Sequence, residues 1–176
     1  MTEIRSTLDI IMEKAKTLTV TDEDKKGFAE KEVKGLVKGL FQKYLDGILP
    51  TQQFKTEMAS FDEDRRPFMK KELLTACLSA MTVEGDNQPL FEILDQLLGY
   101  DIKPVLDLID EFQEQQTEER NKRITERIQT LKELGVSGSA VTPNLGADST
   151  WRAYLSHMED RFQERLKALN IGLPET

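Results

Sequence analysis

The sequence predicts an all-α protein: a helical bundle of about five helices, followed by a long protruding helix and a C-terminal helical hairpin. Nearly every segment carries apolar residues at spacings of three and four, the period of an amphipathic helix. The alternating pattern of a strand is hard to find. With 38% hydrophobic and 32% charged residues in a chain of 176, the composition is that of a soluble globular protein.

Four helices are predicted in the first half of the chain. The first has one apolar face, formed by Leu8, Ile11, Met12, Ala15 and Leu18. The second is expected to begin at the N-cap Thr21, which precedes three acidic residues, and to end at Gly47 and Pro50. Its apolar residues are Phe28, Val33, Leu36, Val37, Leu40, Phe41, Tyr44 and Leu45.

The third and fourth helices are shorter. Thr51 is expected to cap the third, and Asp64 the fourth, with Pro67 in its first turn. The fourth helix has the widest apolar face, which predicts a central position: Phe68, Met69, Leu73, Leu74, Ala76, Cys77, Leu78, Ala80 and Met81. Small residues four apart, Gly35 with Gly39 and Ala76 with Ala80, are interpreted as packing devices that bring helices close together.

A turn at residues 85–87 and a short apolar helix at 90–98, stopped at Gly99, precede the longest helix. Asp101 is its predicted N-cap, Pro104 lies in its first turn, and its apolar period continues to Leu134. A helix over 102–134 would be about 50 Å long at roughly 1.5 Å per residue. A compact chain of this size is about 40 Å across, so we expect part of the helix to protrude.

Residues 113–123 of this helix include no apolar side chain. A helix that is polar all round either bridges solvent between two bodies or is wrapped by a partner. The sequence therefore predicts three parts: a bundle at 1–112, a polar helical bridge at 113–123 and a helical hairpin at 124–176. Residues 135–149 are interpreted as a connector, and the last helix has an apolar stripe from Trp151 to Leu169.

Charge is distributed unevenly along the chain, whose formal net charge is −8. Residues 84–119 contain eleven acidic side chains against Lys103 alone, and residues 120–132 carry a net charge of +4. The plain interpretation is a solvated surface with ion pairs between neighbouring helical turns. The alternative is that these blocks steer a partner.

Catalytic and ligand-binding patterns are weak. His157 is the only histidine, which excludes any site that needs two, and we expect it at the surface or in a dimer seam. Cys77, the only cysteine, lies among apolar neighbours and is expected to be an inert buried thiol. A stripe of carboxylates on one helix does not converge on a cation. We therefore expect no cofactor, no metal site and no nucleic-acid partner, the last because the calculated pI is near 4.9 and no binding motif is present.

The expected cellular location rests on two signals that the sequence lacks. Residues 1–20 lack the uninterrupted apolar region of a secretory signal, and no later stretch approaches the roughly 18 apolar residues of a membrane span. We expect a cytoplasmic protein without a membrane partner.

The leading functional hypothesis is a non-enzymatic interaction or scaffold protein that forms a homodimer through its C-terminal hairpin, because two isolated amphipathic helices bury too little to be stable. The candidate dimer interface consists of Ile124, Ile128, Leu131, Trp151, Leu155, Met158 and Phe162. The candidate acidic docking face, for a basic protein partner or for the second protomer, consists of Asp107, Glu111, Glu114 and Glu118. The alternative is a helical-bundle enzyme or small-ligand-binding protein with a pocket near Phe41, Tyr44, Cys77 and Met81.

Overall fold

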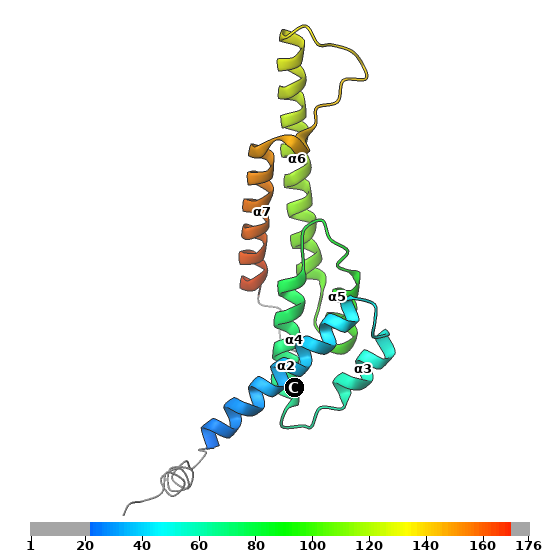
Figure 1. The fold of residues 1–176 in the computed structure, drawn as a ribbon, viewed down its shortest axis with the longest axis vertical. Helices are drawn as coiled ribbons and strands as arrows, with labels where there is room; N and C mark the ends of the chain where they lie inside the picture. The colour runs from blue at the N-terminus through cyan, green and yellow to red at the C-terminus, as the bar shows by residue number, and fades with distance from the viewer. Residues whose placement is uncertain (1–21, 170–176) are drawn as a thin grey trace, which may run out of the picture. The chain divides into compact units, whose positions relative to one another are not determined.

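A computed structural model describes residues 22–169, and this part of the chain contains six α-helices and no strand (Figure 1). The all-α prediction is confirmed. The first predicted helix, with Leu8 and Leu18, and the predicted cap Thr21 lie outside the described residues. The chain divides into two compact units between Glu72 and Leu73.

The first unit is built on helix α2, which spans Asp22–Leu45, and helix α3, which spans Thr51–Ala59. Gly47 turns the chain between them with a φ of +70°, a backbone conformation that favours glycine. Tyr44 of α2 stacks on Phe54 of α3, with ring centroids 4.7 Å apart. Val33, Val37, Phe54 and Met58 are all at most 1% exposed, so the two helices share one apolar core.

Two ion pairs join α2 to the residues after α3. Arg65 lies 3.5 Å from Glu32, and Lys34 lies 3.4 Å from Glu72 in helix α4, which spans Arg66–Ala80. All four side chains are partly exposed, so each pair contributes only about 0 to 1 kcal/mol. The apolar core is the main source of stability here.

One expectation for this unit was wrong. Thr51 is the first residue of α3, and the N-cap position is held by Pro50, whose fixed φ and extended ψ bring the chain into the helix without a side-chain cap. Phe28 and Leu36 are 66% and 48% exposed, because the single face of α2 that carries Val33 and Val37 is the one that packs. Among the described residues, a Cβ built on Gly35 or Gly39 meets no atom within 4 Å, so the packing expected at these glycines is not seen in this part of the chain.

The second unit holds the end of α4 and the remaining elements. Helix α5, Gln88–Glu92, runs into a π-helical turn, η1, Ile93–Leu97, and Gly99 then turns the chain with a φ of +75°. Helix α6 spans Lys103–Glu133, a short 3₁₀ turn, η2, spans Leu145–Ala147, and helix α7 spans Ser149–Ala168. The fully buried side chains of this unit include Leu73, Met81, Leu94, Val105, Phe112, Phe162 and Leu166.

The connection between α4 and α5 is a tight turn locked by side chains. Asn87 accepts a hydrogen bond from the Thr82 backbone N–H, 3.2 Å away, and donates one to the Thr82 carbonyl at 2.8 Å. A Cβ on Gly85 would overlap Thr82 Oγ1, so a larger residue here would require the Thr82 side chain to move. Residues 81–84 form an irregular stretch between α4 and this turn.

That stretch is held by long side chains from two helices. Gln113 of α6 donates to the Val83 carbonyl at 2.8 Å, and Gln163 of α7 donates to the Met81 carbonyl at 2.6 Å. The Val83 N–H donates to Glu159 of α7 at 3.4 Å. Side chains thus satisfy backbone groups that have no helix or sheet partner.

Helix α6 is continuous over its 31 residues, close to the predicted span of 102–134. The predicted N-cap Asp101 was wrong: the N-cap is Ile102, and the Asp101 carboxylate, one residue earlier, accepts from the Lys103 N–H at 2.9 Å. Pro104 lies in the first turn, and Gly135 follows the helix with a φ of +80°. The predicted part boundaries at 112 and 123 both fall inside this helix, whereas the two compact units divide at residue 72.

Candidate interaction site on helices α6 and α7

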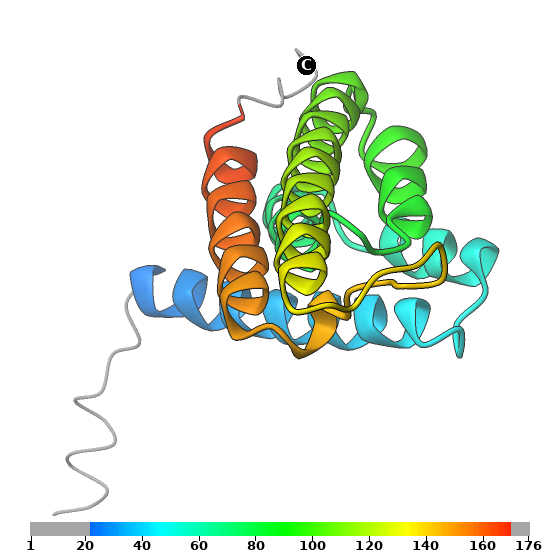
Figure 2. The same ribbon diagram turned by 90° about the horizontal axis from the view of Figure 1, so that it is seen from above.

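Helix α7 lies alongside α6 and runs in the opposite direction (Figure 2). Near the end of α7, Phe162 contacts Phe112 edge to face, with ring centroids 5.5 Å apart at 71°. Arg165 makes a two-pronged ion pair with Glu111, whose second bond is 2.8 Å long. Near the start of α7, Trp151 and Tyr154 lie beside Arg123.

This packing covers only part of the polar run at 113–123, where α7 lies on one side and residues 83–84 on another. Gln115, Gln116, Glu119 and Arg123 are buried or half-buried, and the other seven residues of the run are exposed. Gln116 is only 7% exposed and donates to the Glu84 carboxylate, while the Tyr154 hydroxyl donates to the Gln115 carbonyl at 3.5 Å. The run was expected to bridge solvent or to be wrapped by a partner, and the covering element is a helix of the same chain.

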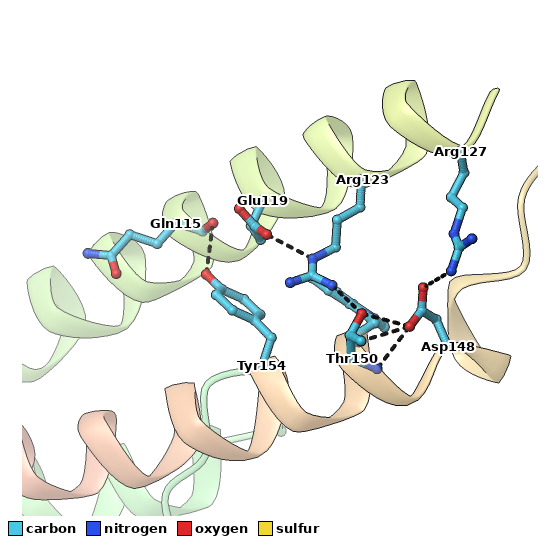
Figure 3. Close-up of polar contacts among 8 residues, drawn as sticks. Gln115, Glu119, Arg123, Arg127, Asp148, Thr150 and Tyr154 are labelled. Carbon is cyan, nitrogen blue, oxygen red and sulfur yellow. Dashed lines mark hydrogen bonds and ion pairs between the residues drawn. The ribbon is translucent and has the colours of Figure 1, made fainter. Parts of the chain in front are cut away.

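Arg123 is the centre of the contact between the two helices (Figure 3). Its Nε donates to Glu119 and its Nη1 to the Thr150 hydroxyl, both at 2.8 Å. The guanidinium carbon lies 5.6 Å from the Trp151 ring centroid and 5.5 Å from that of Tyr154, and the two rings stack on each other. A planar cation with a fork of donors suits this place, since it binds a carboxylate, a hydroxyl and two rings at once.

Asp148 caps α7 and also joins it to α6. Its carboxylate accepts from the Thr150 N–H at 2.8 Å, from the Thr150 hydroxyl at 2.7 Å and from Arg127 of α6 at 2.7 Å (Figure 3). The Arg127 hydrogen bond, followed by those from Thr150, holds the pKa of this carboxyl well below its ordinary value. Sequence reasoning placed Asp148 in the connector and missed it, although an aspartate before an apolar helical period is an N-cap signal.

A surface hollow of about 290 Å³ lies next to this cap. The ion pair of Arg127 and Asp148 forms its charged edge, and the two charges satisfy each other. Its lining residues are Arg127, Leu131, Pro143, Asn144, Leu145, Ala147 and Asp148. The hollow therefore offers a ligand few polar groups that are not already engaged.

The seven candidate interface residues fall into two groups. Trp151, Met158 and Phe162 are at most 6% exposed within the single chain, and Leu155 is half-buried. Ile124, Ile128 and Leu131 of α6 are half-buried, and Leu134 just beyond them is 74% exposed. The second group is thus the one with apolar surface left for another molecule.

Ile128 lies in a surface hollow lined only by residues of α6 itself: Thr125, Glu126, Ile128, Gln129 and Lys132. At about 100° per residue, Ile128 lies about 140° around α6 from Arg123 and about 100° from Arg127, the residues that contact α7 and its cap at this level, whereas Leu131 lies only about 40° from Arg127. Apart from the connector beside Leu131, no other described element lines these hollows.

Two of the four candidate acidic docking residues have partners within the chain. Asp107 pairs with Lys103 at 2.9 Å, and Glu111 pairs with Arg165, which lowers the pKa of the Glu111 carboxyl. Glu114 and Glu118 are exposed and form no ion pair with another described residue, and the same holds for Asp110. The exposed acidic stripe is therefore Asp110, Glu114 and Glu118, at successive helical turns.

The basic block that was expected to meet this stripe is also partly engaged. Arg123 and Arg127 have the partners given above, which leaves Arg120, Lys122 and Lys132 as its exposed members without a described ion pair.

The candidate catalytic residues are far from activated. Cys77 is fully buried, and burial raises the pKa of its thiol to about 12, so the thiolate needed for nucleophilic attack is disfavoured. His157 is exposed on α7. Phe41 and Tyr44 belong to the first unit and Cys77 and Met81 to the second, and all four are buried.

Over residues 22–169, no group of three or more histidine, cysteine, aspartate or glutamate side chains is placed to hold a metal ion. No helix in that range has the length and apolar character needed to cross a membrane. No protein-family model, curated protein or solved structure matches the chain.

Proposed function

We propose that this chain is a non-enzymatic interaction protein that self-associates through the outer face of α6 at Ile124, Ile128 and Leu131. One observation carries the proposal: Ile128 lies in a surface hollow lined only by its own helix, between two further half-buried apolar residues. An apolar stripe that the described residues cover only in part favours pairing with a matching stripe. The buried residues Trp151, Met158 and Phe162 act indirectly, by holding α6 in place.

The expected association is weak. Completing the burial of a half-buried isoleucine or leucine contributes about 0.5 to 1 kcal/mol, a third of the full value of about 1.5 to 3. Six such side chains in a two-fold pair contribute about 3 to 6 kcal/mol before the cost of association, and Leu134 can add to this. Because association itself costs at least about 4 kcal/mol, we expect a dissociation constant of millimolar or weaker.

Sedimentation equilibrium of the full chain, from low micromolar to millimolar concentration, tests this. Ile128→Glu should give monomers throughout, because a charge in a desolvated seam costs several kcal/mol unless it is paired. The matched control is Thr130→Glu, which adds the same charge at an exposed position on the other side of α6. A wild type that stays monomeric, or a Thr130→Glu protein as impaired as Ile128→Glu, would argue against the proposal.

The acidic stripe of Asp110, Glu114 and Glu118 is proposed as a second contact surface, for a basic partner or for the second protomer. In an antiparallel pair it would meet Arg120, Lys122 and Lys132 of the other copy, and association would then weaken as salt rises. Reversal of Lys122 and Lys132 to glutamate should weaken the pair, and Glu114→Lys with Glu118→Lys should partly restore it. Association that ignores salt would assign the stripe to a basic partner.

Point substitutions are preferable to truncation in these experiments. Removal of the chain after residue 113 would also remove Phe162 and Leu166, which are fully buried in the second unit. Loss of a partner would then follow from unfolding rather than from loss of a contact.

A further inference from the structure

The outer face of α6 carries charged residues beside its apolar ones. Glu118 and Lys132 are exposed, and neither forms an ion pair with another described residue. They lie on one line along the helix, with Thr125 midway between them, because seven residues at about 100° each make nearly two full turns. Thr125 and Lys132 also line the hollow in which Ile128 lies. The line of charges therefore runs beside the apolar residues proposed for self-association.

Part of this line lies on the side of α6 away from α7. At about 100° per residue, Thr125 and Lys132 are about 160° and 180° around the helix from Arg123, whereas Lys132 is only about 40° from Ile128. Arg123 marks the contact with α7 at this level, through Thr150 and the neighbouring rings. A helix of another molecule that contacts Ile128 will therefore also meet Lys132.

The signs of the two charges select the direction of a pair of α6 helices. In a symmetric parallel pair each residue faces its own counterpart, so Glu118 would face Glu118 and Lys132 would face Lys132. In an antiparallel pair with a two-fold axis beside Thr125, Glu118 of each copy faces Lys132 of the other. Because like charges repel and opposite charges attract across such a contact, the antiparallel direction is favoured.

The same axis brings the apolar residues of the two copies together. Since both helices rise by the same distance per residue, the residue numbers of facing positions add up to about 250 to 252. Ile124 of each copy then packs against Ile128 of the other, and Leu131 meets Asn121 at each end of the seam. The spacings of three and four from Asn121 to Leu131 are those of a coiled-coil seam.

Neighbouring registers of the same seam match fewer residues. An axis about half a heptad further along the chain would set Ile128 against Leu131. Ile124 and Glu118 would then face residues beyond Glu133, where α6 ends. A shift of the same size in the other direction would set all three apolar residues against polar ones. Only the axis beside Thr125 matches the isoleucines and the charges together.

We propose that Glu118 and Lys132 fix an antiparallel pairing of α6 with α6 of a second copy, about a two-fold axis beside Thr125. This inference rests on the proposed self-association and adds its direction and register. Exposed ion pairs add little affinity, so these two residues act on specificity: they select one arrangement among those that the apolar residues alone would allow.

Disulfide trapping with the full chain tests this arrangement. One variant carries Asn121→Cys and the other Leu131→Cys, and isotopic labelling of one variant identifies mixed disulfides by mass. In the control mixture Leu131→Cys is replaced by Thr130→Cys, which places the thiol at an exposed position on the other side of α6. Cys77 is fully buried and should not take part.

Under mild oxidation the mixed disulfide should form at least about tenfold faster than in the control mixture, because a disulfide requires Cα atoms within about 7 Å of each other. It should also form faster than either variant links to itself. Glu118→Lys in both variants should slow it several-fold. Glu114→Lys is the matched control, since it makes the same change of charge at a position that faces residues beyond the end of the partner's α6.

The possible results separate this inference from the self-association on which it rests. Faster linking of each variant to itself would show a parallel pair and overturn the arrangement, while self-association would stand. Equal rates in the two mixtures, with a wild type that dimerises in sedimentation, would overturn the register and the direction. Equal rates with a monomeric wild type would overturn both proposals.

Discussion

Replacement of Phe162 by alanine separates packing within one chain from packing between two. Phe162 is fully buried in the single chain, on the edge of the Phe112 ring. Truncation of a buried phenylalanine to alanine costs about 3 to 5 kcal/mol, of which the ring pair accounts for about 0.5 to 1.5. At about 2 to 4 °C per kcal/mol for a chain of this size, the unfolding midpoint should fall by about 6 to 20 °C.

Trp151 makes this measurement specific. It is the only tryptophan in the chain and lies at the contact between α6 and α7, so its fluorescence reports unfolding of the second unit alone. Thermal unfolding should be followed at two protein concentrations that differ by about a hundredfold. Over this range the free energy of unfolding of a dimer would change by about 2.7 kcal/mol, so its midpoint would move. The Phe162→Ala midpoint should be low and independent of concentration.

Leu155→Ala is the matched control on the same helix, because Leu155 is half-buried and should cost clearly less. If Phe162 instead packs against a second copy, Phe162→Ala will melt like the wild type at low concentration and differ only where the wild type associates. That result would refute the antiparallel packing of α7 on α6 within one chain.

Three further predictions concern the same unit. Asp148→Asn should lower the midpoint by several degrees at neutral pH, and the gap to the wild type should narrow in acid. The reason is that a carboxyl whose pKa is lowered on folding stabilises the protein above its ordinary pKa of 3.8, and this contribution is lost as the pH falls toward the lower pKa of the folded state. A difference in midpoint between the two proteins that stays constant down to strongly acidic pH would contradict the assigned hydrogen bonds. Arg123→Lys should shift the Trp151 fluorescence and lower the free energy of unfolding in urea by about 1 kcal/mol. Lysine keeps the charge but cannot contact Glu119, Thr150 and both rings together. An unchanged spectrum would mean that the stacked arrangement is not formed. Cys77 should react with a thiol reagent only as fast as the protein opens, because its thiol is buried with a pKa near 12; rapid labelling of the native chain would show that the α4 core is open.

Sequence patterns were sufficient where local rules decide the structure. Pro104 marks the start of α6 and Gly135 its end, and the structure places the helix within one residue of the predicted span at each end, although its N-cap is Ile102 and not Asp101. Likewise, Met69, Leu73, Cys77 and Met81 recur at four-residue spacing and are buried. Capping, proline and glycine rules depend only on neighbours in the chain.

Apolar periodicity did not predict the cover over the polar run, because the contacts there are made by polar side chains. Gln113 and Gln163 bind backbone carbonyls, and Arg123 lies against two rings. A pattern based on apolar spacing assigns all such residues to solvent. The same limit explains Phe28 and Leu36, whose apolar character alone does not say which of two faces of α2 packs inside the first unit.

The glutamine contacts to residues 81–83 also indicate which positions can vary between related chains. A hydrogen bond to a main-chain carbonyl requires a particular donor side chain, but it is indifferent to the side chain of the residue that accepts it. Val83 can therefore change to another apolar residue of similar volume, whereas Gln113 and Gln163 have few substitutes. Leucine at either position would leave a carbonyl without its partner, at a cost of about 1 to 3 kcal/mol where water cannot replace it. Within this unit, we expect Gln113 and Gln163 to change more slowly between related chains than Val83.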